Sequence, residues 1–192
     1  ARRVPACLRA LKAGSIDSAR AILQRRPELL PLALDTLLIG VTAFFRDREV
    51  FDDIRDVLVP RLAVLGRPPR AWSAACSSGA ELYGLAILLD EAGLLDGARL
   101  LGTDCRDGAT AASRAGIFAA EAVRSLAPER AARAFVPIGA DRVRVAPRLL
   151  AACSWKTENL AHACEPGPWD VVLWRNSAIY MEPAAAAEIH RR

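Results

Sequence analysis

Residues 70–89, RAWSAACSSGAELYGLAILL, decide the fold of this 192-residue chain. The run AWSAA at 71–75 is small and apolar, which is typical of a strand buried in a parallel sheet. A turn of small residues follows at 76–79, and Glu81 opens a helical pattern with apolar positions at i, i+3, i+4 and i+7. Open α/β sheets bind nucleotide-like ligands at such a turn, where Gly79 can adopt a positive φ. The same strand, turn and helix also occur without a ligand, so the spacing alone leaves both interpretations open.

An acidic residue stands at the end of the next apolar run, ARLLGTD at 98–104. Asp104 follows the start of the first helix by about 20 residues, the spacing at which an acidic side chain accepts hydrogen bonds from ribose hydroxyls. Because the carboxyl ends of parallel strands meet at one edge of the sheet, we expect Asp104 beside the turn at 76–79. The sequence therefore predicts a site for a ligand that carries a ribose.

The composition argues against several classes of protein. Hydrophobic residues make up 53% of the chain, aromatic residues make up 6%, and the net charge is only +4. With few aromatic residues and no dense basic cluster, we expect no nucleic-acid partner. No apolar run reaches the roughly 18 residues of a transmembrane helix, and the first residues lack the apolar core of a signal peptide. We therefore expect a cytoplasmic protein without membrane insertion.

The cysteines and histidines argue against metal and disulfide chemistry. The five cysteines are odd in number and form no CxxC pair, which favours free thiols in a reducing compartment. Only two histidines are present, so we expect neither a metal site nor a histidine-based catalytic triad.

The chain divides into a helical segment at 1–40 and a larger α/β domain at 41–192. Helical spacing runs through 5–38, with a break at Gly14 and a second helix at 16–24. The domain begins with a helix over 48–62. Asp47 is placed to cap this helix, and the expected buried positions are Val50, Ile54, Val57 and Leu58.

The remaining elements are expected from periodicity and turn residues. A helix is expected within 107–118 that ends near Gly116, and 121–135 is expected to be helical with Pro128 at a first helical position. Residues 149–160 are expected to form a strand followed by a polar turn, and a further strand is expected at 169–176. Alternation over 135–145 with a turn at 139–141 predicts a hairpin, which forms a small β insertion at 135–147. Arg142 and Arg144 on this hairpin are expected at the surface. Pro183 opens a final helix.

Several blocks of the sequence resemble those of the CheR-type chemotaxis receptor methyltransferases, in the family's order. They are VTAFFRD (41–47), WSAACSSGAELYGLA (72–86), GTD (102–104) with SRAGIF (113–118), ENL (158–160) and WDVVLWRNSAIYME (169–182). TAFFR and the RN-x-x-IY pattern are the most specific of these. The resemblance implies an α/β, Rossmann-like methyltransferase fold that uses S-adenosyl-L-methionine and releases S-adenosyl-L-homocysteine.

The resemblance also implies roles for individual residues. Glu81 matches the carboxylate that meets the methionyl ammonium of the cofactor, and Asn159 with Leu160 matches the pair near the adenine. Arg46 and Tyr180 are the implied catalytic residues, with Tyr180 orienting the acceptor and Arg46 holding its carboxylate. The implied cofactor-binding residues are Thr42, Arg46, Gly79, Glu81, Asp104, Asn159, Leu160, Arg175 and Asn176. No metal is implied.

Two hypotheses about function follow from the resemblance. The first is methyl transfer to glutamate side chains of a chemoreceptor or a related signalling protein. The second is a non-catalytic module of the same fold that binds the cofactor and a partner protein. The retained residues favour the first, whereas Gly40 in place of the family's Asn and Ala80 in place of its Glu favour the second.

The end of the sequence lacks strands that the resemblance implies. About four parallel strands and a hairpin are expected here, whereas sheets of this methyltransferase class normally have seven strands. We expect the strand at 169–176 to lie at the edge of the sheet. Its run VVLW is apolar and uncharged, which is unfavourable at an open edge. Three alternatives follow: the sequence is a fragment, a second copy of the chain or another protein covers this edge, or the fold closes in an unfamiliar way.

Overall fold

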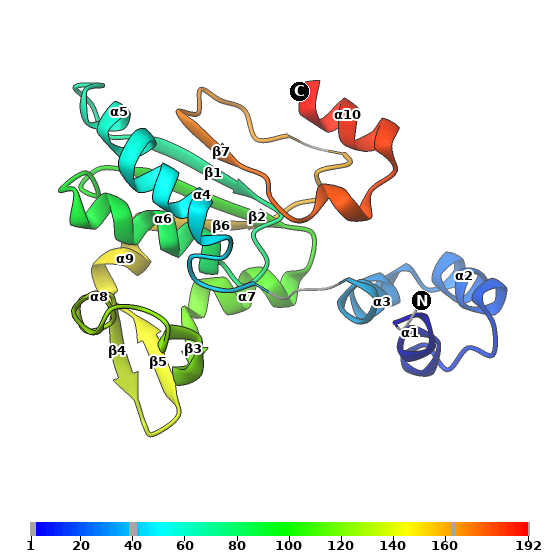
Figure 1. Cartoon of the computed structure of the whole chain (residues 1–192). Coiled ribbons are helices and arrows are strands. Elements are labelled where there is room, and N and C mark those ends of the chain that lie inside the picture. The colour runs from blue at the N-terminus through cyan, green and yellow to red at the C-terminus, as the bar shows by residue number, and fades with distance from the viewer. Residues whose placement is uncertain (1–2, 39–41, 163, 192) are drawn as a thin grey trace.

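A four-stranded parallel sheet forms the centre of the computed structural model, which describes residues 3–38, 42–162 and 164–191, with Tyr180 described by its backbone alone. The strands are β1 (Arg70–Ala74), β2 (Arg99–Asp104), β6 (Cys153–Thr157) and β7 (Val171–Leu173), in the order β6–β2–β1–β7 (Figure 1). The α/β class with a parallel sheet is therefore confirmed. Within the described residues β7 is an edge strand, as predicted, and Val172 at its centre is 51% exposed.

The alternation of side chains along β1 divides the interior into two cores. Ala71 faces the larger core, whereas Trp72 and Ala74 face a smaller one on the other side of the sheet. The smaller core also contains Leu101 of β2 and Leu160, and it is covered in part by Trp169 and Ile189. Both faces of the sheet are therefore buried at β1, where the one polar side chain inside the strand, Ser73, hydrogen-bonds to Glu81.

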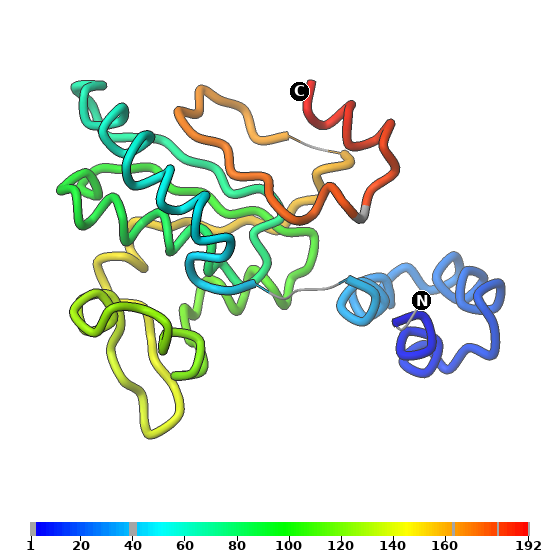
Figure 2. Tube along the Cα trace, in the orientation of Figure 1, coloured from blue at the N-terminus to red at the C-terminus, as the bar shows by residue number. Residues whose placement is uncertain are grey.

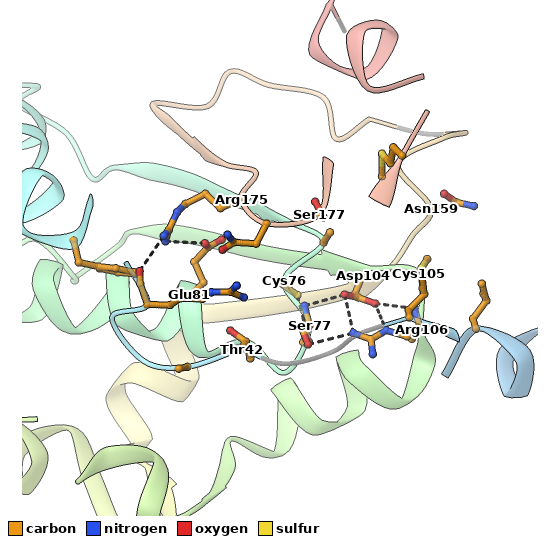
Figure 3. Close-up of a pocket in the computed structure, with 18 residues that line it drawn as sticks. Thr42, Cys76, Ser77, Glu81, Asp104, Cys105, Arg106, Asn159, Arg175 and Ser177 are labelled. Carbon is orange, nitrogen blue, oxygen red and sulfur yellow. Dashed lines mark hydrogen bonds and ion pairs between the residues drawn. The ribbon is translucent and has the colours of Figure 1, made fainter. Parts of the chain in front are cut away.

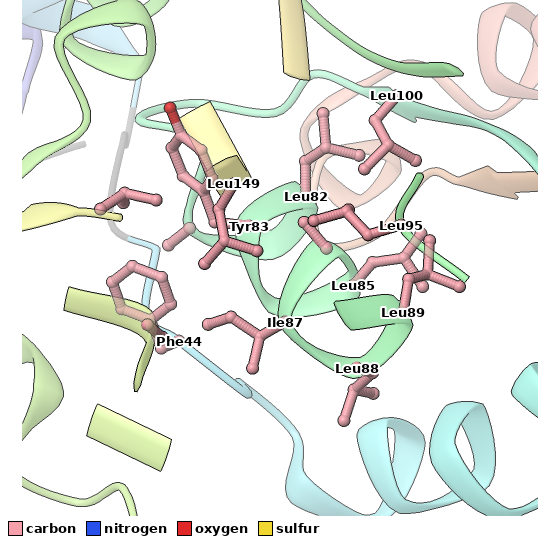
Figure 4. Close-up of a cluster of buried hydrophobic side chains, with 14 of the residues drawn as sticks. Phe44, Leu82, Tyr83, Leu85, Ile87, Leu88, Leu89, Leu95, Leu100 and Leu149 are labelled. Carbon is pink, nitrogen blue, oxygen red and sulfur yellow. The ribbon is translucent and has the colours of Figure 1, made fainter. Parts of the chain in front are cut away.

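Helix α6 (Ala80–Glu91) is the centre of the larger core. Nine of its twelve residues are buried, among them Leu82, Tyr83, Leu85 and Leu89 (Figure 4). Gly84 lies under the ring of Phe51, since a Cβ added there would be 2.9 Å from a ring carbon. The glycine thus trades some helix propensity for close packing between α6 and the helix that contains Phe51.

The helix predicted at 48–62 forms, but it changes its winding in the middle. It consists of α4 (Arg48–Asp53), a π-helical turn η2 (Ile54–Leu58) and α5 (Val59–Ala63). Pro60 has no N–H and its ring would collide with the carbonyl four residues earlier, which accounts for a wider turn just before it. The prediction for Val50 and Val57 is wrong, since they are 38% and 48% exposed. Val57 lies in the π-helical turn, which shifts the buried face there, whereas Val50 lies before it. The buried side chains are instead Phe51, Ile54, Val59 and Leu62.

A second, three-stranded sheet lies apart from the central one (Figure 1). The predicted hairpin is present as β4 (Phe135–Ile138) and β5 (Arg142–Val145), and Arg142 and Arg144 are exposed as expected. The prediction missed a third strand, β3 (Ile117–Ala119), which pairs antiparallel with β5. The helix predicted to end near Gly116 is confirmed, because α7 (Asp107–Ala115) ends at Gly116 with φ +59. Phe44 joins this sheet to the main core by ring contacts with Phe118 and Phe135.

Three further predictions of element boundaries need correction. The helical pattern at 121–135 is broken into a 3-10 turn, η3 (Ala120–Val123), and the short helix α8 (Pro128–Ala134), which begins at Pro128 as predicted. Within 149–160, predicted as a strand followed by a polar turn, the first residues belong to helix α9 (Pro147–Ala152), which Pro147 opens, and the strand is β6. The strand predicted at 169–176 is limited to β7, since the chain leaves the sheet and Asn176 adopts φ +56.

The two ends of the described chain are helical (Figure 2). The first part contains α1 (Val4–Ala10), α2 (Ile16–Arg25), η1 (Pro27–Leu29) and α3 (Leu30–Leu37), which share a small core around Cys7, Leu11 and Ala33. The last part contains η4 (Ala178–Tyr180) and α10 (Pro183–Arg191). Among the described residues, no helix combines the length and the apolar character that crossing a bilayer requires.

Candidate functional site

A cavity of about 350 Å³ opens where the carboxyl ends of β1, β2 and β7 meet (Figure 3). Pockets of this size bind small molecules and cofactors, and this is the predicted edge of the sheet. Seven of the predicted cofactor-binding residues line it: Thr42, Arg46, Glu81, Asp104, Asn159, Arg175 and Asn176. They come from segments far apart in the sequence, so the fold brings them together.

The turn between β1 and α6 has an unusual backbone. Ala75, Ser77 and Gly79 all have positive φ angles, of +57°, +53° and +83°. Such angles are uncommon for residues other than glycine and occur often at ligand-binding sites. The Cys76 N–H holds the turn to β2 by donating to the carbonyl of Thr103 at 2.8 Å. Gly79 contributes to the turn through its backbone conformation and does not itself line the cavity.

Asp104 accepts hydrogen bonds from the β1–α6 turn and from Arg106. Its Oδ2 accepts from the Ser77 N–H at 2.8 Å, which joins the end of β2 to the β1–α6 turn. Its Oδ1 accepts from the Arg106 N–H at 3.1 Å and from Arg106 Nε at 3.0 Å. The Asp104 side chain is 5% exposed, so these donors compensate for most of the water it loses.

Glu81 lies on the first turn of α6 and points into the cavity (Figure 3). Its Oε1 accepts from the Ser73 hydroxyl at 2.9 Å, and its Oε2 accepts from Arg175 Nη1 at 3.2 Å. Burial raises the pKa of Glu81 above its ordinary value, although Ser73, Arg175 and Arg46 oppose this by favouring the anion. The Glu81 carboxylate is thus a hydrogen-bond acceptor that has little contact with water.

Arg175 connects the segment at 42–47 to the sheet. Its Nη2 donates to the carbonyl of Arg46 at 2.9 Å and to Asp47 Oδ2 at 2.7 Å. The prediction that Asp47 caps the following helix is therefore wrong: Asp47 precedes α4, but its side chain makes no capping bond. Through Arg175 the segment is held over the cavity, where Arg46 contributes to the lining.

The remaining predicted residues divide into three groups. Asn159 lines the cavity at the far end, and its Oδ1 accepts from the Ala161 N–H at 3.0 Å. Leu160 is 5% exposed and packs in the smaller core, so its side chain does not line the cavity. The side chain of Tyr180, and all of Gly40, lie outside the described residues.

Among the cavity-lining residues that the sequence did not single out as site residues, Arg106 and Ser177 bear on the chemistry. Arg106 pairs with Asp104, and its place two residues after a predicted ligand-binding carboxylate was the available signal. The Ser177 hydroxyl is buried and makes no hydrogen bond to any residue that the structure describes. Ser177 also lines the cavity, so a bound polar ligand could satisfy its hydroxyl.

The lining combines two carboxylates, Glu81 and Asp104, with the arginines Arg46, Arg106 and Arg175. Glu81 and Asp104 offer acceptors for an ammonium group and for hydroxyls, whereas Arg46 and Arg175 suit a carboxylate. In the described ranges no group of three or more His, Cys, Asp or Glu residues is arranged to hold a metal ion. The cavity therefore suits a zwitterionic ligand that also carries hydroxyl groups.

Comparison with known proteins points in the same direction. Residues 40–192 match the family described as CheR methyltransferase, SAM binding domain. A chemotaxis protein methyltransferase from Vibrio parahaemolyticus is 31% identical over 172 residues, which are 86% of this chain and 62% of that protein. Chemotaxis protein methyltransferase 1 from Pseudomonas aeruginosa is 31% identical over 185 residues, or 91% of this chain and 66% of that protein. A chemotaxis protein methyltransferase from Listeria innocua is 29% identical over 153 residues, which are 79% of this chain and 58% of that protein. The chain thus spans about three fifths of the length of these relatives.

Proposed function

This chain belongs to the CheR methyltransferase family, and from that premise we propose that it methylates glutamate side chains of a chemoreceptor or related signalling protein. The cofactor of the family domain is S-adenosyl-L-methionine. The proposal extends to a cytoplasmic location, which is supported by five cysteines that are all free. The observation that carries the proposal is the cavity in which Glu81 and Asp104 lie at the ends of neighbouring elements.

The residues of the cavity fit this cofactor. S-adenosyl-L-methionine carries an ammonium, a carboxylate and two ribose hydroxyls, and the lining offers carboxylates and arginines for these groups. The buried Ser177 hydroxyl lacks a hydrogen-bond partner among the described residues, which is the mark of a site completed by a polar ligand. The positive φ angles at Ala75 and Ser77 place backbone close to the cavity, where a ligand can approach it.

We assign the residues as the family resemblance suggests. Asp104 accepts from the ribose hydroxyls and Glu81 accepts from the ammonium of the cofactor. Asn159 and the backbone of Leu160 border the adenine. The other proposed cofactor contacts are Thr42, Arg46, Arg175 and Asn176, whereas Gly79 serves the turn and does not line the cavity. Arg46 and Tyr180 act on the acceptor.

The proposed reaction asks little acid–base chemistry of the protein. When bound, S-adenosyl-L-methionine supplies an activated methyl group on a sulfonium. A glutamate acceptor has an ordinary pKa near 4.3, so it is already anionic at neutral pH and needs no general base. The protein contributes by orienting the acceptor carboxylate, which is the role of Arg46 and Tyr180, and by excluding water from the cavity.

A methyl-transfer assay on receptor fragments tests the proposal. Methyl-labelled cofactor is incubated with the purified chain and a fragment that contains candidate glutamates, and the fragment is then treated with alkali. A glutamyl methyl ester releases volatile methanol in alkali, whereas a methyl group on nitrogen stays bound. The control is the same fragment with its candidate glutamates replaced by glutamine. Alkali-labile label that depends on the glutamates supports the proposal.

Two other results would contradict it. Alkali-stable label would show that the acceptor is not a carboxylate. Binding of S-adenosyl-L-homocysteine without methyl transfer to any fragment would favour the non-catalytic, partner-binding module.

A further inference from the structure

The contact between Arg106 and Asp104 bears directly on how the cofactor site is filled. The guanidinium lies side-on to the carboxylate, with Nε 3.0 Å from Oδ1 and Nη2 3.4 Å from Oδ2 (Figure 3). Nη2 also donates to the Ser77 hydroxyl at 3.2 Å. Both side chains are largely buried, at 11% and 5% exposure, and both line the cavity.

The acceptor capacity of Asp104 is filled by these contacts. A carboxylate offers about four lone-pair positions, two on each oxygen. The N–H groups of Ser77 and Arg106 take one position on each oxygen, and the guanidinium takes the other two. Two vicinal hydroxyls would need one position on each oxygen as well. The guanidinium therefore stands where the hydroxyl pair of a ribose would donate.

We infer that Arg106 competes with the ribose of the cofactor, and that its guanidinium leaves Asp104 when the ribose hydroxyls bind. This inference rests on the proposed placement of the ribose at Asp104. Arg106 thereby becomes a residue that sets cofactor affinity in this chain. The backbone donors of Ser77 and Arg106 stay in place throughout, so Asp104 keeps its position while one pair of donors replaces the other.

The geometry of the pair favours such an exchange. The Nη2–Oδ2 distance of 3.4 Å is long for a charged pair. Arg148 and Asp90, which have no place in the cavity, pair side-on at 2.6 and 2.8 Å. Asp35, an exposed carboxylate on α3, is close enough to stabilise the guanidinium electrostatically. When the guanidinium of Arg106 leaves Asp104, both solvent and the carboxylate of Asp35 are near enough to stabilise its charge.

Calorimetry with S-adenosyl-L-homocysteine tests the inference on the full chain. If the paired state holds about nine tenths of the molecules, its removal in Arg106→Ala tightens binding about tenfold. Arg114→Ala is the matched control, since Arg114 lies on the same helix and donates to the Trp155 carbonyl, away from Asp104. We expect the control to bind as the unmodified chain does.

An analogue of S-adenosyl-L-homocysteine without the two ribose hydroxyls separates competition from other effects. This analogue has no hydroxyls that could replace the guanidinium at Asp104. Arg106→Ala should therefore bind the analogue with the same affinity as the unmodified chain. Equal tightening of both ligands would overturn the inference, because the arginine would then act on some other part of the ligand. Unchanged or weaker binding of S-adenosyl-L-homocysteine to Arg106→Ala would overturn it too.

The outcomes also distinguish this inference from the proposed function. If the unmodified chain binds S-adenosyl-L-homocysteine and Arg106→Ala binds it equally, only the role of Arg106 is lost. If neither protein binds the ligand, the proposed cofactor site fails, and the inference fails with it.

A measurement on the unmodified chain tests the inference even if Arg106→Ala does not fold. The Nε–H signal of Arg106 in a nitrogen NMR spectrum is assigned by its loss in Arg106→Lys. Saturation with S-adenosyl-L-homocysteine should shift this signal to the position of a solvent-exposed arginine and speed its exchange with water. A signal that does not respond to saturating ligand would overturn the inference.

Discussion

Arg175 and Glu81 lie 94 positions apart in the sequence, and Arg175 Nη1 donates to Glu81 Oε2 across 3.2 Å. The same guanidinium holds Asp47 and the carbonyl of Arg46. One side chain at the end of β7 therefore connects α6, the sheet and the segment over the cavity. Its removal would leave a buried carboxylate without its closest cation.

Replacement of Arg175 by alanine should both destabilise the chain and loosen the segment at 42–47. We expect a loss of about 1–3 kcal/mol in the free energy of unfolding, the usual cost of removing a charged partner from a buried group. Hydrogen exchange of the amides at 44–50 should become faster. Arg55→Ala is the control, because Arg55 pairs with Asp52 and Asp56 at the surface and should change stability by less than about 0.5 kcal/mol. Equal effects of the two variants would contradict this assignment.

The stability contribution of Glu81 should depend on pH. Burial raises the pKa of Glu81 above its ordinary 4.5, so the folded state binds the proton more tightly than the unfolded state does. Stability from this residue is therefore present below pH 4.5 and is lost as the pH rises through the elevated pKa of the folded state. Glu81→Gln lacks this pH dependence, so the stability of the variant relative to the unmodified chain should rise with pH over this range, as thermal unfolding at several pH values would measure.

The same substitution should weaken cofactor binding. The proposed partner of Glu81 is an ammonium group, and only the anionic carboxylate attracts it. Affinity of the unmodified chain for S-adenosyl-L-homocysteine should rise as Glu81 ionises, whereas Glu81→Gln should bind weakly and without this pH dependence. A variant whose relative stability does not rise with pH, and which binds normally, would contradict both statements.

Replacement of Asp104 by alanine should weaken binding of S-adenosyl-L-homocysteine by about 1–3 kcal/mol, because the ribose loses its charged acceptor. Calorimetry at one pH and salt concentration measures this difference. Asp107→Ala is the matched control, since Asp107 is exposed at the start of α7, three residues after Asp104, and does not line the cavity. Normal binding by Asp104→Ala would place the ribose elsewhere.

Tyr180 tests whether the chain positions an acceptor. Tyr180→Phe removes one hydroxyl and keeps the ring, so affinity for S-adenosyl-L-homocysteine should stay within about threefold of the unmodified value. Methyl transfer should fall by roughly ten- to a hundredfold, or about 1.4–2.7 kcal/mol of transition-state stabilisation. Arg46→Lys should act in the same direction, because lysine lacks the planar fork of arginine. An unchanged rate in Tyr180→Phe would remove Tyr180 from the mechanism.

The parts of the fold predicted from sequence are those set by local patterns. The strand, turn and helix around Gly79 follow from small residues and helical spacing, and Asp104 follows from the end of an apolar strand. The hairpin was also predicted, because the alternation of apolar and polar residues over 135–145 and the turn at Gly139 specify it locally. The third strand of that sheet was not, since three residues carry no measurable periodicity and only pairing with β5 defines it.

The misjudged parts depend on contacts between distant residues or on competing local signals. Pro60 changes the winding of its helix and so changes which side of it is buried. Asp47 has the residue type of a helix cap, but Arg175 from the far end of the domain takes its carboxylate. The position of Arg106 against Asp104 likewise depends on the β1–α6 turn, whose Ser77 accepts from the same guanidinium.

The packing of Trp155 under the turn has a consequence for how the site opens. A Cβ added at Gly79 would lie 2.6 Å from its indole ring, and the ring also packs against Tyr83 at 5.1 Å between centroids. The turn cannot separate from the sheet unless this indole withdraws from the core, so its amides should exchange only in rare, large openings of the domain. The segment at 42–47 is held both by Arg175 and by Phe44, whose ring packs against Phe118 and Phe135. The turn is therefore expected to keep its shape while a ligand binds and leaves.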